Sequence, residues 1–383
     1  MYIVENTSCT DNQTENNKYS RMAAKQHFIG GKLLDTGTYS CIFDPPLKCR
    51  TRSKTPKKSD TITRTIQKKA MRMISKLMMD EEAEVEWAIS EKIRKIPEWI
   101  RYFSVAETMC ELSPQQTETE LKTKCQVIKN ISTKQLRVLQ MPYAGTPIYN
   151  HPISRNFNLT DFVIHILEAS ALLLVYNIIH FDLHPGNILL DEHDTPRIID
   201  FNLSMSSDIS VPESQLSYRY SRNFHLPQQP PDYTAVIGIN QHKDILKIIR
   251  NIKDKDIIRD IRTVLSLTDS TIESDIRKMI QNNSFIGNGD ITGWFHKYWS
   301  KIDSWAIGTY LVDMIKNHAI SPQIGKAYTA DSGKLKHIIK SLCAIDPDTR
   351  WDCMQALEHI HPNSHIIKKY MGAWSSSYKT AAK

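Results

Sequence analysis

Residues 178–190 read IIHFDLHPGNILL, a short polar turn between two apolar runs. Burying a polar group costs roughly 2–7 kcal/mol unless it is hydrogen bonded. His180, Asp182, His184 and Asn187 must therefore bond to one another or hold a ligand. We assign His180 to the packed core as a hydrogen-bonded residue, and Asp182 and Asn187 to a candidate site.

A second acidic residue follows closely. The apolar stretch IIDF at residues 198–201 comes just after a polar turn, so Asp200 is expected to return beside Asp182 and Asn187. Carboxylate and amide oxygens suit Mg²⁺, which is usually bound by such protein oxygens together with phosphate oxygens of a substrate. In this interpretation Asn187 and Asp200 hold the metal, and Asp182 orients a hydroxyl nucleophile. Taken singly, each could instead be only a turn former.

The bulk composition is that of a globular protein. The chain has 383 residues, 40% of them hydrophobic and 24% charged, enough for one large core or two modest ones. It shows no secretory signal and no apolar run long enough to span a bilayer, so we expect a cytoplasmic protein. Its seven cysteines form no Cys-x-x-Cys pair, which predicts free thiols in a reducing compartment rather than a Cys41–Cys49 disulfide.

The net charge is local. Residues 48–76 carry eleven Lys or Arg and one acid, +10 in all, so the rest of the chain is near −3 against a total of +7. This segment lacks the interleaved aromatic residues that stack on bases, so no specific nucleic-acid partner is expected.

Along the chain, strand signals precede helix signals, which predicts an α+β fold. Residues 1–26 are polar and read as a disordered tail. We expect strands within 34–42, 70–78 and 136–145, with a loop over 49–66. Helices are expected over 80–96, 159–178, 241–282 and 302–317 from their periodicity and end signals.

The spacing Asp182-x-x-x-x-Asn187, followed by Asp200-Phe201-Asn202, resembles the catalytic loop and metal motif of eukaryotic protein kinases. Other segments agree in order: LDTGTYSCI (34–42) resembles the glycine-rich loop, MISK (73–76) supplies a strand lysine, and DSWAIG (303–308) and DPDTR (346–350) resemble large-lobe motifs. GTYSCIFDPPLKC and the long insertions are similar to the divergent serine/threonine kinases of nucleocytoplasmic large DNA viruses.

The resemblance implies a bilobal protein-kinase-like fold with a small β-rich lobe over 27–145 and a larger, mainly helical lobe over 146–362. A helical insertion is expected at about 235–295 and a C-terminal tail at 363–383. The implied activity is transfer of the γ-phosphate of Mg-ATP to serine or threonine of protein substrates. The implied location is the cytoplasm; for a viral chain this would be the cytoplasm of the host cell or the virion. No oligomeric state is assigned.

The resemblance also implies residue roles. Lys76 would hold the α- and β-phosphates, with Glu86 or Glu84 as its partner; Glu86 is favoured because Ile89 and Ile93 then follow it on the inward face. The adenine would meet backbone groups of Met141 and Tyr143. The remaining nucleotide contacts would come from the glycine-rich loop and the large lobe: Leu34, Gly37, Ile42 and Leu189.

The chain also departs from the kinase pattern. The phosphate loop keeps only Gly37, and Asn202 replaces a glycine, although Asn tolerates left-handed backbone angles. These departures leave a weakly catalytic pseudokinase scaffold as an alternative. His184 replaces a lysine, and HxDLHPGN also resembles aminoglycoside and choline phosphotransferases, a second alternative. Against the latter, Asp232 is expected to pair with Arg350 as in the protein-kinase large lobe.

Overall fold

The computed structural model describes residues 31–54, 72–114, 116, 121, 123–207, 216, 226–317 and 322–381. The tail expected at 1–26 and residues 55–66 of the expected basic loop lie outside these ranges.

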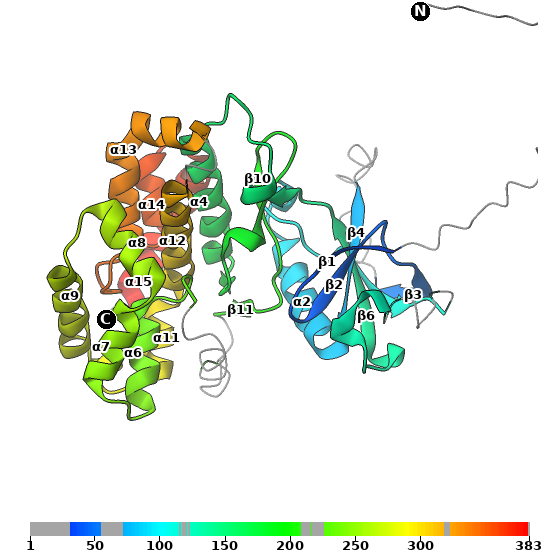
Figure 1. Cartoon of the computed structure of the whole chain (residues 1–383), viewed down its shortest axis with the longest axis horizontal. Helices are drawn as coiled ribbons and strands as arrows, with labels where there is room; N and C mark the ends of the chain where they lie inside the picture. The colour runs from blue at the N-terminus through cyan, green and yellow to red at the C-terminus, as the bar shows by residue number, and fades with distance from the viewer. Residues whose placement is uncertain are drawn as a thin grey trace, which may run out of the picture.

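The first part of the described chain is an antiparallel sheet with the strand order β1-β2-β4-β6-β5-β3 (Figure 1). Its strands are β1 (Lys32–Thr36), β2 (Ser40–Asp44), β3 (Cys49–Lys54), β4 (Met73–Met79), β5 (Thr108–Leu112) and β6 (Leu136–Pro142). Strand β4 lies inside the sheet, with Lys76 opposite Ile42 on one side and Leu139 on the other. A central strand fixes its side chains more firmly than an edge strand, because both of its backbone edges are paired.

Helix α2 (Asp80–Ile93) follows β4 directly and packs against β4 and β6. Three acids occupy its first turn and a lysine its last, which suits the helix dipole. Its inner face buries Glu86 among apolar neighbours, while Ile89 and Ile93 belong to the core shared with the helical part. The helix expected over 80–96 therefore forms over most of that range.

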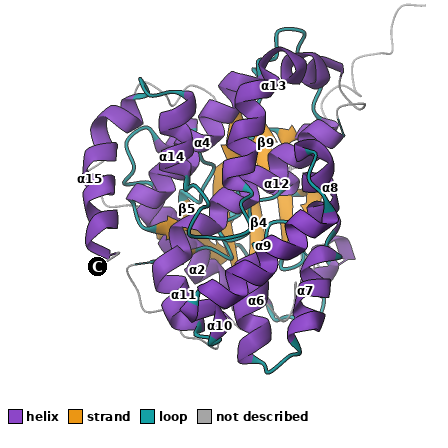
Figure 2. Cartoon of the chain, turned by 90° about the vertical axis from the view of Figure 1, so that its left-hand side faces the viewer, coloured by secondary structure: helices purple, strands orange, loops and turns teal. Residues whose placement is uncertain are grey.

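The remainder is mostly helical and surrounds α4 (Leu159–Val175) and α12 (Ile302–Lys316) (Figures 1 and 2). The Asn158 side chain caps α4 by accepting from the amides of Thr160 and Asp161. This part also contains β7 (Thr146–Pro147), β8 (Ile178–Ile179), β9 (Ile188–Leu190), β10 (Pro196–Ile198), β11 (Met205–Ser206), α13 (Pro322–Leu342), α14 (Cys353–Ile360) and α15 (His365–Ala381).

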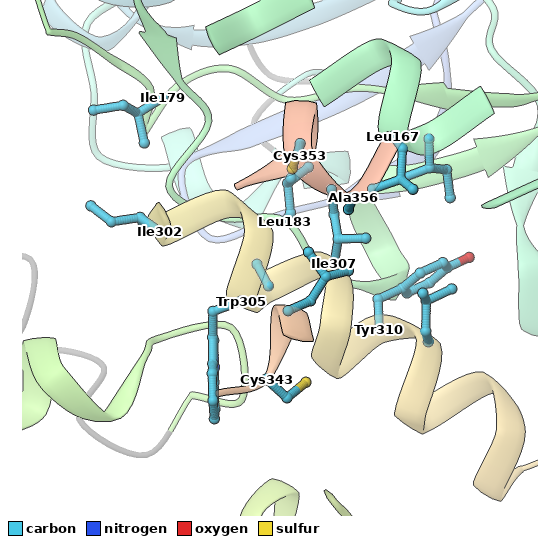
Figure 3. Packing of buried hydrophobic residues seen from close by; sticks show 14 of the residues in the cluster. Leu167, Ile179, Leu183, Ile302, Trp305, Ile307, Tyr310, Cys343, Cys353 and Ala356 are labelled. Carbon is cyan, nitrogen blue, oxygen red and sulfur yellow. The ribbon is translucent and has the colours of Figure 1, made fainter. Parts of the chain in front are cut away.

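The core of this part is built on α12. Trp305 and Ile307 of α12 are buried in one cluster with Cys353 and Ala356 of α14. In Figure 3, Ile307 lies toward Ala356 and Trp305 lies on the side of Cys343. The sheet comes first along the chain and most of the helices follow it, which confirms the predicted α+β, kinase-like fold class.

The single helix expected over 241–282 is wrong. The segment between β11 and α12 instead contains α6 (Pro231–Asn240), α7 (Ile245–Lys253), α8 (Asp256–Leu265), α9 (Asp269–Asn282), α10 (Ser284–Gly287) and α11 (Ile291–Tyr298). The helix is interrupted at Lys255, whose side chain is buried, and again at Ser266, which has a left-handed φ of 56°. Apolar periodicity continues through both breaks, so the pattern alone could not locate them.

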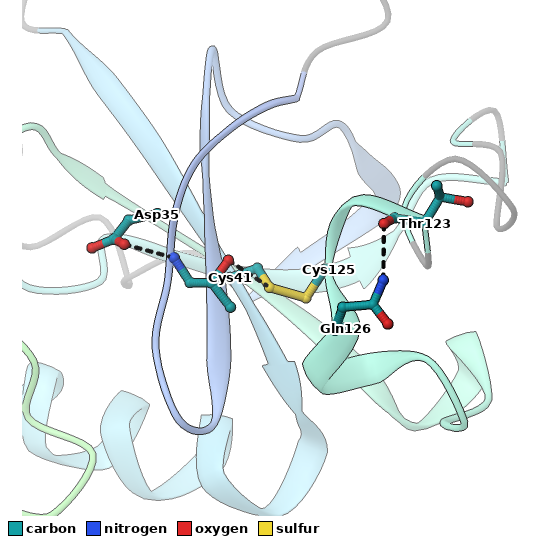
Figure 4. The surroundings of a disulfide bond; sticks show 6 residues. Asp35, Cys41, Thr123, Cys125 and Gln126 are labelled. Carbon is teal, nitrogen blue, oxygen red and sulfur yellow. Dashed lines mark hydrogen bonds between the residues drawn. A yellow bond between two sulfur atoms is a disulfide. The ribbon is translucent and has the colours of Figure 1, made fainter.

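The cysteine prediction is also wrong for four residues. Cys41 pairs with Cys125 across 84 residues of sequence (Figure 4). Cys49 pairs with Cys110 across 61 residues. Cys49 belongs to β3, which forms where a loop was expected and pairs with β5. Pairing of β3 with β5 brings Cys49 and Cys110 together, and the segment around Cys125 packs against β2, which holds Cys41. Sequence spacing cannot show either contact. Cys343 and Cys353 are free and buried.

Within the described ranges, no helix combines the length and the apolar character needed to cross a bilayer.

Candidate active site

Lys76 lies between two carboxylates. Its Nζ is 2.7 Å from Glu86 Oε2 and 2.8 Å from Asp200 Oδ1, and the side chains of Lys76 and Glu86 are each only 3% exposed. Strand β4 supplies the lysine, α2 supplies Glu86, and the segment after β10 supplies Asp200. The partner of the lysine is thus Glu86, whereas Glu84 lies on the exposed face of α2.

The charges of this cluster depend on one another. Burial lowers the pKa of Lys76, but the carboxylates of Asp200 and Glu86 outweigh it and leave the pKa raised. Burial raises the pKa of Glu86 above its usual value even beside Lys76. For Asp200, the attraction of Lys76 outweighs burial and lowers the pKa. The lysine is therefore firmly protonated and available to an anionic ligand.

The loop before Asp182 is held from below by Asp303 of α12. Its two carboxylate oxygens accept the backbone amides of His180 (2.7 Å) and Phe181 (2.9 Å). Phe181 has a φ of 68°, a conformation that a bulky residue adopts only when its surroundings enforce it. His180 is buried, and its Nε2 meets the Ile199 carbonyl at 2.9 Å, which agrees with its assignment to the core. These contacts fix the turn that carries Asp182.

Asp182 and Asn187 are joined within that turn. Asn187 Nδ2 donates to the Asp182 carbonyl at 2.9 Å and lies 3.5 Å from Asp182 Oδ2. His184 Nε2 is 3.7 Å from the same Oδ2. The amide of Asn187 is thereby oriented with its nitrogen toward Asp182, so its oxygen is the atom left for a ligand.

One cavity of about 650 Å³ lies between the sheet and the helical part, and its lining includes Lys76, Glu86, Asp182, His184, Asn187 and Asp200. This volume is within the usual range for small-molecule sites. Every residue that the sequence analysis named for the site lines it: Leu34, Gly37, Ile42, Lys76, Glu86, Met141, Tyr143, Asp182, Asn187, Leu189 and Asp200.

One backbone assignment differs from the expectation. The amide of Tyr143, expected to donate to adenine, donates to the Arg72 carbonyl at 2.8 Å. The carbonyl of Pro142 accepts from Ser104 Oγ at 2.6 Å. The connector between the two parts is thus tied to its neighbours, and the adjoining Ala144 and Gly145 also line the cavity.

The metal turn also differs in detail. The left-handed residue is Asp200, with a φ of 62°, and not Asn202, to which this conformation was assigned. The turn at the tip of β1 and β2 closes through a bond from the Gly37 amide to the Ser40 carbonyl (2.9 Å). Cavity-lining Asp35 accepts the Thr36 amide, which places a carboxylate beside this loop.

The donor set fits Mg²⁺. Asn187 offers an amide oxygen, and Asp200 has a second carboxylate oxygen beyond the one that meets Lys76. In the described part of the chain, no group of three or more His, Cys, Asp and Glu side chains could hold a metal by itself. Mg²⁺ retains several waters and relies on substrate phosphates, so a site of two protein oxygens suits it.

The expected pair between Asp232 and Arg350 is confirmed. Arg350 Nη2 lies 2.6 Å from Asp232 Oδ1, and both side chains are almost completely buried. Asp232 Oδ2 accepts from Trp294 Nε1 at 2.9 Å. This pair anchors the start of α6 to the segment before α14.

One residue of the site was not expected from the sequence: Gln228, whose Nε2 donates to Asp182 Oδ1 at 2.8 Å. No local signal marked it, since it lies in a Ser-, Pro- and Gln-rich stretch far along the chain. It also lines a second cavity of about 580 Å³ that shares Asp182 and His184 with the first.

The fold and this site define a kinase-like domain. Residues 54–215 match a protein family described as the ABC1 atypical kinase-like domain. That range includes Lys76, Glu86, Asp182, Asn187 and Asp200 and ends before α12. Comparison with curated protein sequences returned no match.

Proposed function

We propose that the chain is a protein kinase that transfers the γ-phosphoryl group of Mg-ATP to serine or threonine hydroxyls. The observation that carries the proposal is the convergence of Lys76, Asp182, Asn187 and Asp200 on one nucleotide-sized cavity. Transfer of a phosphoryl group depends mainly on positioning and charge neutralisation, and these residues supply both.

The steps follow from the site. The Lys76 ammonium binds phosphate oxygens, and Asn187 and Asp200 would hold Mg²⁺, which neutralises phosphate charge when bound. The acceptor oxygen forms a bond to the γ-phosphorus, the bond to the β–γ bridging oxygen breaks, and ADP leaves with that electron pair. Asp182 orients the acceptor hydroxyl and takes up its proton.

The acceptor is proposed to be a protein hydroxyl and not a small alcohol. The buried Asp232–Arg350 pair favours a protein-kinase large lobe. The narrower kinship with kinases of large DNA viruses and a cytoplasmic location stay predictions from the sequence. A small-alcohol phosphotransferase and a nucleotide-binding scaffold are the competing outcomes of the test.

The test is transfer of labelled phosphate from Mg-ATP by the full chain to a basic protein, an acidic protein and a panel of small alcohols. We expect phosphoserine or phosphothreonine with the wild type and loss of at least about 100-fold in Asp182→Asn, the usual scale for acid–base groups. Asp161→Asn, the same change at an exposed position of α4, serves as the control.

Transfer only to small alcohols would replace the protein acceptor. Nucleotide binding without any transfer would favour the scaffold. Transfer that survives in Asp182→Asn would contradict the role given to this carboxylate.

A further inference from the structure

The contact between Gln228 and Asp182 joins parts of the chain that are 46 residues apart. At 2.8 Å it is shorter than the other side-chain contacts of the Asp182 carboxylate among the described residues, since the Asn187 and His184 nitrogens lie 3.5 and 3.7 Å from the other oxygen. Gln228 is only 5% exposed, so water competes poorly for this bond. The amide therefore has a strong influence on where the carboxylate points.

The backbone around Gln228 is held on both sides. Trp305 Nε1 of α12 donates to the Pro227 carbonyl at 2.9 Å. The buried Lys255 donates through Nζ to the Gln229 carbonyl at 3.2 Å. A turn fixed at both neighbours leaves the Gln228 side chain little freedom, which is the condition for a group that positions another.

Asp182 and Gln228 lie where the two cavities meet. Both residues line the second cavity, and Asp182 also lines the cavity that contains Lys76 and Asp200. An acceptor that enters through the second cavity would meet a phosphoryl group held in the first at the Asp182 carboxylate.

We propose that Gln228 is a positioning residue for the phosphoryl transfer proposed above: its amide holds Asp182 Oδ1, so that Oδ2 is presented to the acceptor hydroxyl. The inference rests on that proposed function. In the step, the acceptor oxygen binds the γ-phosphorus, ADP departs with the electrons of the broken bond, and the acceptor proton passes to Asp182. Gln228 gains and loses no atom.

An amide suits this task because it is neutral. It can hold the carboxylate in place without adding a charge beside it. A carboxylate at the same place would instead repel Asp182 and displace it.

The experiment compares Gln228→Met, which keeps the length of the side chain and removes the donor, with Gln229→Met. Gln229 is the matched control because it lies in the same turn and is equally buried. We expect Gln228→Met to lower kcat about 10- to 100-fold with KM for ATP unchanged, since part of the acid–base contribution is lost while the nucleotide contacts remain. Gln228→Glu is expected to lower kcat further, and Gln229→Met to stay within about two-fold of the wild type.

Thermal unfolding and nucleotide affinity of each variant separate positioning from misfolding. A kcat of Gln228→Met within two-fold of the wild type, an equal loss in Gln229→Met, or a rise in kcat would overturn the inference while leaving the proposed function intact. A rise would mean that Gln228 blocks Asp182. A wild type without Asp182-dependent transfer would overturn the proposed function, and this inference with it.

Discussion

Replacement of Lys76 by methionine removes the cation that two carboxylates share. Glu86 Oε2 and Asp200 Oδ1 lie 2.7 and 2.8 Å from Nζ, and Glu86 has almost no exposure to water. Breaking a buried ion pair by removing one partner costs about 3–5 kcal/mol, because the remaining charge has no compensation. We expect the free energy of unfolding at pH 8 to fall by about this amount in Lys76→Met.

The loss should depend on pH in a defined direction. Burial already raises the pKa of Glu86, and removal of Lys76 raises it further. Between the pKa of an unfolded glutamate and this raised value, the folded state binds more protons than the unfolded state, so stability falls as pH rises. At pH values above the folded pKa of Glu86, each unit by which this pKa is raised lowers the free energy of unfolding by about 1.4 kcal/mol. The defect of Lys76→Met should therefore be smaller at pH 5 than at pH 8.

The assay is urea unfolding at both pH values for the wild type, Lys76→Met and Lys76→Met/Glu86→Gln. The double variant should recover most of the loss, because no buried charge remains at Glu86. Lys247→Met, at an exposed lysine of α7, should change stability by less than about 0.5 kcal/mol. An equal loss at pH 5 and pH 8, or no recovery in the double variant, would refute the electrostatic reasoning.

Two further predictions concern the helical part of the chain. Arg350→Met should lower the free energy of unfolding by about 3–5 kcal/mol because it strands the buried Asp232 carboxylate, and Arg350→Met/Asp232→Asn should regain part of it in thermal unfolding; no difference between these two variants would contradict this. Burial lowers the pKa of Lys255 to about 7, so the unfolded state binds more protons between about pH 7 and pH 10.5 and stability should rise with pH there. The rise, on the order of 5 kcal/mol in full, should be absent from Lys255→Met, and equal pH slopes for the two proteins would count against it.

Local signals predicted the elements that they encode. Acids in the first turn of α2, the apolar spacing of α4 and the apolar run of α12 are each contained in consecutive residues, and those helices form near the expected positions. The polar turn at residues 178–190 likewise indicated a candidate site, because polar groups between apolar runs must find hydrogen-bond or ligand partners.

Such local signals could not predict contacts between residues that are far apart in the sequence. The breaks at Lys255 and Ser266 leave the apolar period unchanged, so they follow from how α8 and its neighbours pack. The partners of Cys41 and Cys49 depend on sheet order, which spacing does not reveal.

By itself, the sequence determined which chemical groups the site would contain, since Asp182, Asn187 and Asp200 lie within one short stretch whose spacing limits what they can do. Only the tertiary structure decided between Glu86 and Glu84 as the partner of Lys76, and showed that the Gln228 amide holds Asp182. The physical reason is distance along the chain: a turn and the strand after it are fixed by local geometry. Contacts across tens of residues exist only once the sheet and helices have packed.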